Sequence, residues 1–499
     1  MTSRIRKYIA LVLVLPLLGV SIRAAPRTLK ITQIYATAQT ADSATVVWNT
    51  NLAADSLLQY STINPVPAGA PQVFSANQTT VHEVPLAALM PGTVYFYKVT
   101  SCVKKGCVSE GGSFETLPDC PDVVPAVSGS WQSALSPNVP AVNNQLLGVA
   151  AVSDNDVWTV GWAQDPNAPS YVKRTLIEHF NGSTWNIVPS PNKRDDTISE
   201  LYSVAGTSAT DVWAVGSSND GKLPSRTLIQ HWDGAAWSIV PSPSPDNQFN
   251  ELRGVAAISA NNAWAVGYRG GTKNQTPIET FILHWDGLSW TQVTSPNVSD
   301  GANQLFSITA ISAGDIWAVG SVSGGPLALH WNGSAWSVVP VGVGSGLSTE
   351  SFAAVTGSSA NDVWAVGKGQ GIFSNQKFAT IRHWDGSRWT EKLCRAASAS
   401  NPPLGFEGGG PDAYFTGVSA AASNDVWAVG VRGSGPMILH WDGQAWTEVT
   451  HPRAFPNAAV LNAVNASATG AAWSVGIEID VSPSGAASPA STLIDRYSP

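Results

Sequence analysis

Short runs of alternating apolar and polar residues fill the chain from residue 28 onward, and turn residues separate them. The first ninety or so residues of this region contain six such runs, at 30–35, 43–49, 56–61, 80–86, 93–101 and 107–116. Alternation with a period of two, bounded by Gly, Pro, Asn and Ser, predicts β-strands, and no helical period is visible. We therefore expect an all-β protein.

A longer unit repeats through the rest of the chain. One copy has an apolar run at 201–208, the segment Asp211-Val-Trp-Ala-Val-Gly216, and further runs at 227–232 and 233–240. Four β-runs separated by turn signals are the content of one β-propeller blade. The tryptophan of the second run recurs at intervals of 46 to 63 residues, which predicts seven blades: Trp158, Trp213, Trp264, Trp317, Trp364, Trp427 and Trp473.

The two ends of this repeat region are incomplete in complementary ways. The fourth run of each unit carries another tryptophan, but only six copies follow residue 150: Trp185, Trp237, Trp290, Trp336, Trp389 and Trp446. The segment 129–138, which contains Trp131, matches the fourth run at 183–192, whereas the chain ends on a third run at 492–497. Pairing these two ends would cover an open strand edge. We expect the N-terminal strand to complete the seventh blade and close the propeller.

Two resemblances follow from these residues. Residues 27–118 resemble a fibronectin type III sandwich, in which Trp48 would be the core aromatic and Tyr95 the residue of the tyrosine corner. Residues 129–499 resemble kelch-like and galactose-oxidase-like propellers, although the kelch glycine pair is absent. A module similar to residues 27–118 precedes the catalytic domain of purple acid phosphatases. In this sequence, however, no cluster of Asp, His and Asn that could hold two metals follows the module.

The N-terminus and the charge indicate where the protein acts. Residues 1–25 combine Arg4, Arg6 and Lys7 with a short apolar run and the small residues Ala24 and Ala25, which is typical of a signal peptide. No later run is long enough for a transmembrane helix, so we expect a secreted or extracytoplasmic protein. Its net charge of −8 becomes more negative when the segment is removed, which argues against a nucleic-acid partner. Residues 119–128 would be a linker.

The cysteines and histidines have structural interpretations. Cys102 and Cys107 bracket a predicted hairpin turn and are expected to form a disulfide, whereas Cys120 and Cys394 could form a tether or remain free. No histidine stands near any cysteine at zinc-site spacing, so no metal is predicted. Six histidines occupy one position of six blades: His179, His231, His284, His330, His383 and His440. We interpret each as the hydrogen-bond partner of a turn, and the candidate acceptors are the aspartates before the second run, Asp156, Asp211, Asp315, Asp362 and Asp425.

The repeated Asp-Gly and Asn-Gly pairs, which begin at residues 181, 233, 286, 332, 385 and 442, predict two-residue hairpin turns of type I′. Calcium sites are not predicted, because no further carboxylates accompany each pair.

Enzyme chemistry finds no support in the motifs. The chain has no nucleophile elbow, no established arginine triad, and only one cysteine in the propeller region, so neither a serine hydrolase, a sialidase nor a copper-radical oxidase is indicated. We predict no catalytic residue and no cofactor.

The loops after the second and fourth runs vary most, and in a propeller both classes emerge on one face. That face is the predicted recognition surface. Its candidate ligand-binding residues are Trp162, Tyr171, Arg174, Arg226, Tyr268, Arg269, Lys368, Phe373, Arg432 and Glu478. Aromatic, basic and amide side chains together suit a glycan or an extracellular protein. The sequence thus favours a non-enzymatic binding or adhesion protein, and leaves open a glycan-processing hydrolase or lyase and a purely structural surface protein.

Overall fold

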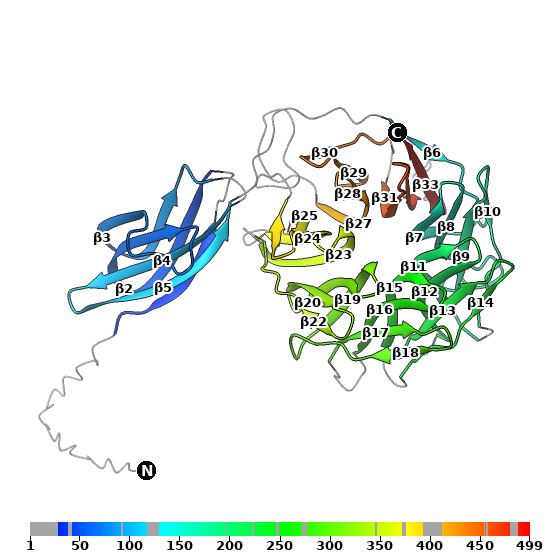
Figure 1. Cartoon of the computed structure of the whole chain (residues 1–499), viewed down its shortest axis with the longest axis horizontal. Coiled ribbons are helices and arrows are strands. Elements are labelled where there is room, and N and C mark those ends of the chain that lie inside the picture. The colour runs from blue at the N-terminus through cyan, green and yellow to red at the C-terminus, as the bar shows by residue number, and fades with distance from the viewer. Residues whose placement is uncertain are drawn as a thin grey trace, which may run out of the picture.

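The computed structural model describes residues 28–37, 42–90, 93–116, 129–193, 195–221, 224–245, 249–271, 277–344, 347–371, 376–392, 412–453, 455, 458–479 and 488–499. All regular elements in these ranges are β-strands, which confirms the all-β prediction. Figure 1 shows an N-terminal curled sheet and a ring of further sheets. The predicted signal peptide, the predicted linker at 119–128, Cys120 and Cys394 lie outside the described residues.

The N-terminal sheet has five strands rather than the six predicted. They are β1 (Ile31–Thr37), β2 (Ala44–Ser61), β3 (Gln72–Leu86), β4 (Val94–Val103) and β5 (Gly106–Glu115). The runs predicted at 43–49 and 56–61 are one strand, because residues 50–55 contain no Gly or Pro and stay extended. The first half of β2 pairs with β1 and β3 and its second half with β3 and β4, with register shifts between Asn49 and Ser56. These shifts accompany the curl of the sheet.

Trp48 and Tyr95 lie in the core of this sheet. Trp48 is fully buried, donates its indole N–H to Ser101 Oγ at 2.9 Å and stacks on His82. The Tyr95 hydroxyl accepts the Met90 backbone N–H at 2.9 Å.

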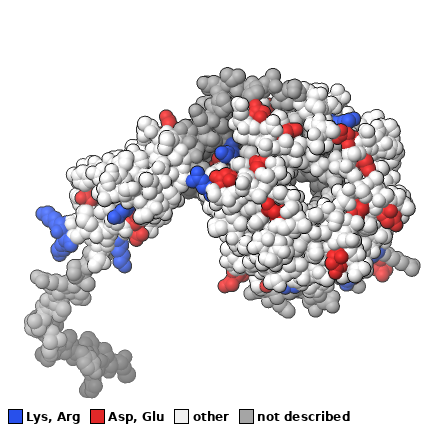
Figure 2. Space-filling view, viewed as in Figure 1, with Lys and Arg blue, Asp and Glu red and all other residues white. Residues whose placement is uncertain are grey.

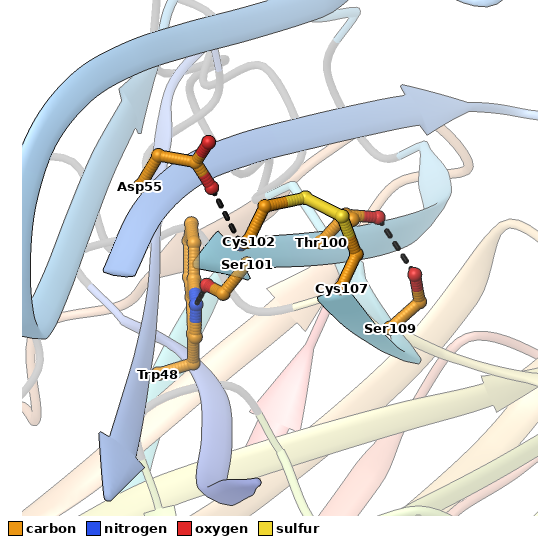
Figure 3. The surroundings of a disulfide bond; sticks show 7 residues. All are labelled: Trp48, Asp55, Thr100, Ser101, Cys102, Cys107 and Ser109. Atoms are coloured by element: carbon orange, nitrogen blue, oxygen red, sulfur yellow. Dashed lines mark hydrogen bonds between the residues drawn. A yellow bond between two sulfur atoms is a disulfide. The ribbon is translucent and has the colours of Figure 1, made fainter. Parts of the chain in front are cut away.

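Cys102 and Cys107 form the predicted disulfide across β4 and β5 (Figure 3). The Asp55 carboxylate accepts the Cys102 N–H at 2.6 Å, which ties the bridge to β2.

The strands that follow form four-stranded antiparallel groups consistent with β-propeller blades, and we number them by their first strand. One eight-stranded sheet consists of two such groups joined by a single parallel bridge between Lys173 and Ile198. Blades 1 and 2 are β7 (Asn144–Ser153), β8 (Asp156–Gln164), β9 (Lys173–Phe180), β10 (Trp185–Ile187), and β11 (Ile198–Ser208), β12 (Asp211–Asn219), β13 (Arg226–Trp232), β14 (Trp237–Ile239).

Blades 3 to 5 are separate four-stranded sheets. Their strands are β15 (Phe249–Ser259), β16 (Asn262–Gly270), β17 (Glu279–Trp285), β18 (Trp290–Val293); β19 (Asn303–Ser312), β20 (Asp315–Val322), β21 (Gly325–Trp331), β22 (Trp336–Val338); and β23 (Leu347–Ser359), β24 (Asp362–Gly371), β25 (Lys377–Trp384), β26 (Trp389–Glu391).

Blade 6 comprises β27 (Ala413–Ala422), β28 (Asp425–Arg432), β29 (Gly435–Trp441) and β30 (Trp446–Glu448). Blade 7 comprises β31 (Ala458–Ala466), β32 (Ala472–Ile479), β33 (Ser491–Ser498) and the early strand β6 (Ser130–Ala134). Strand β6 pairs with β33 from Ser130–Ser498 to Ala134–Ile494. Asn138 then accepts the Thr492 N–H at 2.9 Å, as Asn297 accepts the Thr280 N–H in blade 3.

Tryptophans hold neighbouring blades together. The buried tryptophan of each second strand packs edge-on against the fourth-strand tryptophan of the next blade, with ring centroids 5.2–5.7 Å apart and interplanar angles of 74–87°. The pairs are 158 with 237, 213 with 290, 264 with 336, 317 with 389, 364 with 446, 427 with 131, and 473 with 185. The last two pairs run through blade 7 back to blade 1.

The six repeated histidines have the structural role that the sequence predicted. Each bonds through Nε2 to the first residue of its blade's second strand, at 2.7–3.0 Å; this partner is Asp in five blades and Asn262 in blade 3. The centroid of each imidazole also lies 4.0–4.5 Å from the ring centroid of the buried tryptophan on the second strand of the same blade. In blade 7 Arg496 takes this place, 5.1 Å from the Trp473 ring.

The turns between third and fourth strands correct one prediction. They hold four residues, and only the glycine has positive φ, between 91° and 96°. A type I′ turn would need positive φ at the preceding residue as well. Instead, as at Asp233, the side-chain oxygen of that residue accepts the N–H groups of Ala235 and Ala236 at 2.8 and 2.9 Å. The local side-chain bonds therefore stabilise a longer connection.

Candidate functional site

A glycine and a bulge together shape the inner edge of every blade. The glycine of each Val-Gly pair lies on the second strand, where an added Cβ would stand only 1.8–2.1 Å from a carbonyl oxygen of the first strand: Gly161, Gly216, Gly267, Gly320, Gly367, Gly430 and Gly476. Only glycine permits this approach. In all seven blades the pairing of the first and second strands shifts by one residue directly after the first-strand residue that pairs with this glycine. The shift leaves one residue of the first strand unpaired. Such a bulge re-aims the side chain of the extra residue.

The seven bulged residues line a central cavity of about 340 Å³, formed by the first strands of all the blades. Figure 2 shows a hollow at the centre of the ring. The residues on either side of each bulge are stereotyped, but the bulged residues differ from blade to blade: Leu147, Tyr202, Arg253, Phe306, Ala353, Thr416 and Asn462. The scaffold thus presents seven chemically different side chains to one space.

Blade 3 contributes a hydrogen-bonded trio to the rim of this cavity. Arg253 donates from one terminal nitrogen to Glu251 at 2.5 Å and to the Tyr268 hydroxyl at 3.2 Å. The Tyr268 hydroxyl donates to Glu251 at 2.7 Å, and the ring of Tyr268 meets Phe306 of blade 4 edge-on. Charged partners make such bonds strong and fix the orientation of the guanidinium.

Blades 1 and 2 extend the same network. The guanidinium carbon of Arg253 lies over the Tyr202 ring, 4.1 Å from its centroid, and the Tyr202 hydroxyl donates to Glu200 at 2.7 Å. Glu200 in turn pairs with Lys173 at 2.6 Å, and the Lys173 ammonium lies 3.8 Å from the centre of the Trp162 ring. A continuous set of contacts therefore runs along the rim from Trp162 to Phe306.

The ionisation of these groups follows from their surroundings. Burial raises the pKa of Tyr202, and the nearby Glu200 carboxylate raises it further. Burial likewise raises the pKa of Tyr268. Burial opposes the charge on Arg253, but Tyr202, Glu251 and Tyr268 outweigh it, so its pKa is raised. Both phenols remain hydrogen-bond donors and the guanidinium remains charged at physiological pH.

The ten residues predicted from the sequence divide into two groups, apart from Phe373, which lies outside the described residues. Trp162 and Tyr268 belong to the rim network. The others lie on or near the strand ends that carry the variable loops. Of these, Tyr171, Arg226 and Lys368 are exposed.

Four predicted residues are engaged with neighbouring side chains. Arg174 pairs with Asp165 at 3.1 Å, Arg269 with Glu279 at 3.1 Å, Arg432 with Glu448 at 3.0 Å, and Glu478 with Arg453.

Six of the predicted residues lie within the second strands, which continue past the Val-Gly pair: Trp162, Tyr268, Arg269, Lys368, Arg432 and Glu478. The sequence reasoning missed Glu200, Tyr202, Glu251, Arg253 and Phe306. Aligning the seven copies of the first strand would have exposed the variable position between a large apolar residue and a small one.

Other types of site find little in the described part of the chain. No group of three or more His, Cys, Asp or Glu side chains in the described ranges could hold a metal ion. Within the same ranges, no helix has the length and apolarity needed to cross a membrane.

Comparisons with known proteins add no assignment. No protein-family model matches the sequence, and no curated protein matches it either. Among solved structures, the tricorn protease aligns with 90% of this chain at 6% identity and a TM-score of 0.30, and this chain spans half of its length.

Two further solved structures align at similarly low scores. The extracellular domain of a B. thetaiotaomicron hybrid two-component system aligns with 89% of this chain and 62% of its own, at 9% identity and a TM-score of 0.21. The FN1–FN3 domains of chicken CNTN1 align with 62% of this chain and 95% of their own, at 8% identity and a TM-score of 0.14. The description of the fold therefore depends on the strand pairing and not on these alignments.

Proposed function

We propose that this is a secreted or extracytoplasmic, non-enzymatic binding protein that recognises a glycan or an extracellular protein through the variable-loop face of its ring. The observation that carries the proposal is the set of seven different side chains at one bulged position of an otherwise repeated scaffold. Rigid repeats with chemically varied residues around one opening are how β-folds commonly build sites.

The architecture behind the proposal is a fibronectin type III-like module followed by one seven-bladed, kelch-like or galactose-oxidase-like propeller that β6 closes. The pairing of β6 with β33 and the unbroken series of seven tryptophan pairs support the closed ring. The pairing of the two halves of β2 with different partners and the Tyr95–Met90 bond support the fibronectin-like module.

Export is part of the proposal and rests on the sequence of residues 1–25. N-terminal sequencing of the protein recovered from the extracytoplasmic fraction should find a start close to residue 26. An intact N-terminus on cytoplasmic protein would contradict export.

Binding is tested with immobilised glycans and extracellular proteins, with products of any captured glycan followed by mass spectrometry. Saturable binding that Trp162→Ala together with Tyr268→Ala abolishes, without product, would support the proposal. Product formation would replace it with a glycan-processing hydrolase or lyase. Absence of binding to both panels would favour a purely structural surface protein.

A further inference from the structure

The rim of the central cavity carries charges that cancel on one side. In blades 1 to 3, Lys173 is paired with Glu200 at 2.6 Å and Arg253 with Glu251 at 2.5 Å. Each cation also lies against an aromatic ring, Trp162 or Tyr202. Two cations and two carboxylates at this short range leave no net charge on this wall, so it neither attracts nor repels a charged ligand strongly.

On the opposite side of the cavity the bulged residues are small and uncharged. Blades 6 and 7 lie across the ring from blade 3 (Figure 1), and the bulged residues of blades 5 to 7 are Ala353, Thr416 and Asn462. Thr416 and Asn462 use their side chains to bond the backbone of the next blade, at Leu461 and Leu146. The free space is therefore bounded by a hydrogen-bonding, aromatic wall and by a smaller wall that is occupied in holding blades together.

The size of the cavity suits a small group rather than a protein surface. Its volume of about 340 Å³ lies at the lower end of the roughly 300–1,000 Å³ typical of small-molecule sites. A protein partner would need roughly 800 Å² of surface on each side, which the rim alone does not supply.

The chemistry of the charged wall matches hydroxyl groups. Carboxylates such as Glu200 and Glu251 accept from hydroxyls, and Arg253 donates to them. The phenols donate to the two carboxylates and can accept from a ligand hydroxyl, and the half-buried Phe306 offers an apolar face to C–H groups. An anionic ligand would meet both carboxylates, and a cationic one both basic groups. A neutral, polyhydroxylated ring avoids both conflicts.

One basic side chain favours a competing ligand. Lys368 occupies in blade 5 the register position that Trp162 and Tyr268 hold in blades 1 and 3, and it is exposed. An acidic sugar held by Lys368 is therefore the alternative that a test must separate.

We propose that the central cavity binds an uncharged sugar residue that contacts Tyr202 and Arg253, which line it, and the carboxylates of Glu200 and Glu251, to which these two side chains are bonded. The proposal rests on the proposed binding function and specifies its ligand and its position. It predicts preference for neutral over uronate-containing or sulfated oligosaccharides, and inhibition by a free neutral monosaccharide.

Blade 4 supplies the substitution for the test. Glu251→Gln with Arg253→Phe gives the first strand of blade 3 the residues that blade 4 has at the same positions, Gln304 and Phe306. The change removes one charge of each sign, so the net charge of the wall is unaltered. Arg388→Ala, in an exposed turn between third and fourth strands, is a control on the opposite ends of the strands.

The test measures the affinity of the full chain for immobilised neutral and acidic oligosaccharides, with calorimetry for free monosaccharides. The double variant should weaken binding of the neutral sugar at least about tenfold at unchanged melting temperature, and Arg388→Ala should bind as the parent does.

Three results would overturn the proposal and leave the proposed binding function standing. These are a preference for acidic sugars that Lys368→Ala abolishes, neutral binding unaffected by the double variant but lost in Arg226→Ala, and binding only to proteins. If no glycan or protein binds the parent chain, the binding function itself fails.

Discussion

Trp131 packs edge-on against Trp427, with ring centroids 5.2 Å apart, although one belongs to the first strand of the ring region and the other to blade 6. The contact repeats the geometry that joins Trp237 to Trp158 and five further pairs. Trp131 is only 3% exposed. The N-terminal strand is therefore part of the packing that joins blades 6 and 7.

Trp131→Ala should lower the free energy of unfolding by about 3–5 kcal/mol, the usual cost of removing a buried tryptophan. Denaturant unfolding of the full chain measures it. Trp237→Ala should cost a similar amount, and Leu288→Ala, whose side chain is 87% exposed, less than about 0.5 kcal/mol. A wild-type unfolding curve for Trp131→Ala would show that β6 is not needed to complete blade 7.

His231→Ala should destabilise the protein by about 1–3 kcal/mol without affecting ligand binding. The change removes the 2.8 Å bond to Asp211, whose side chain is only 10% exposed, and the contact with the Trp213 ring. A buried carboxylate that loses its partner carries a desolvation cost.

Asp211→Asn is the matched control for this pair. Blade 3 uses Asn262 against His284 at 3.0 Å, so the amide should retain most of the stability at position 211. Thermal unfolding compares the variants. Loss of binding in His231→Ala at unchanged stability would assign the histidine to recognition instead.

The repeated tryptophans and histidines were predictable because each recurs at a fixed place within the four-run unit. The match of 129–138 to other fourth runs likewise predicted the pairing of β6 with β33. Recurrence allows such contacts to be predicted from the sequence, because a single structural role must account for all six or seven copies.

Features without such a pattern escaped the sequence reasoning. The continuity of β2 through residues 50–55 depends on its pairing with three different strands, and local alternation does not reveal that. The turn at Asp233 was assigned to the wrong type because side-chain acceptance of two N–H groups competes with the backbone preference of Asp-Gly pairs.

The candidate site was missed for a related reason. Alternation assigns every second residue of a strand to one face, but the bulge beside Gly267 shifts the register and changes where Arg253 points. Of the rim network, only Trp162 and Tyr268 were among the residues predicted from the sequence.

Glu178 should make the stability of the protein fall as the pH rises. It is fully buried, and burial raises its pKa to about 8, although the bond from Ser136 Oγ at 3.0 Å opposes the shift. In the unfolded chain the carboxyl ionises near its ordinary pKa. Above that pH, ionisation lowers the free energy of the unfolded state, while the carboxyl of the folded state stays protonated. The expected loss is about 1.4 kcal/mol per pH unit at most, between about pH 4.5 and 8.

Glu178→Gln should remove this slope and leave stability at low pH nearly unchanged. Blade 2 has Gln230 at the same position, where its amide donates to the Pro191 carbonyl at 2.9 Å. Urea unfolding from pH 4.5 to 8 compares the two proteins. Parallel curves for both would show that Glu178 is ionised in the folded state.

His82 should destabilise the N-terminal sheet when the pH falls. Its imidazole is 1% exposed, lies between Thr50 Oγ1 at 2.9 Å and Ser56 Oγ at 2.7 Å, and stacks on Trp48. Burial lowers its pKa, with a smaller opposing effect from Asp55. Below about pH 6.5 the unfolded chain therefore takes up a proton that the folded sheet does not, so stability present above this pH is lost as the pH decreases toward the folded pKa.

Hydrogen exchange of the full chain measures this effect locally. Peptides from β2 and β3 should lose protection between about pH 6.5 and 5, after correction for the intrinsic exchange rate, while those from β12 and β20 should not. His82→Gln keeps a neutral polar side chain and should abolish the difference between the two regions. Equal pH dependence in the parent and the variant would assign the effect to other groups of the sheet.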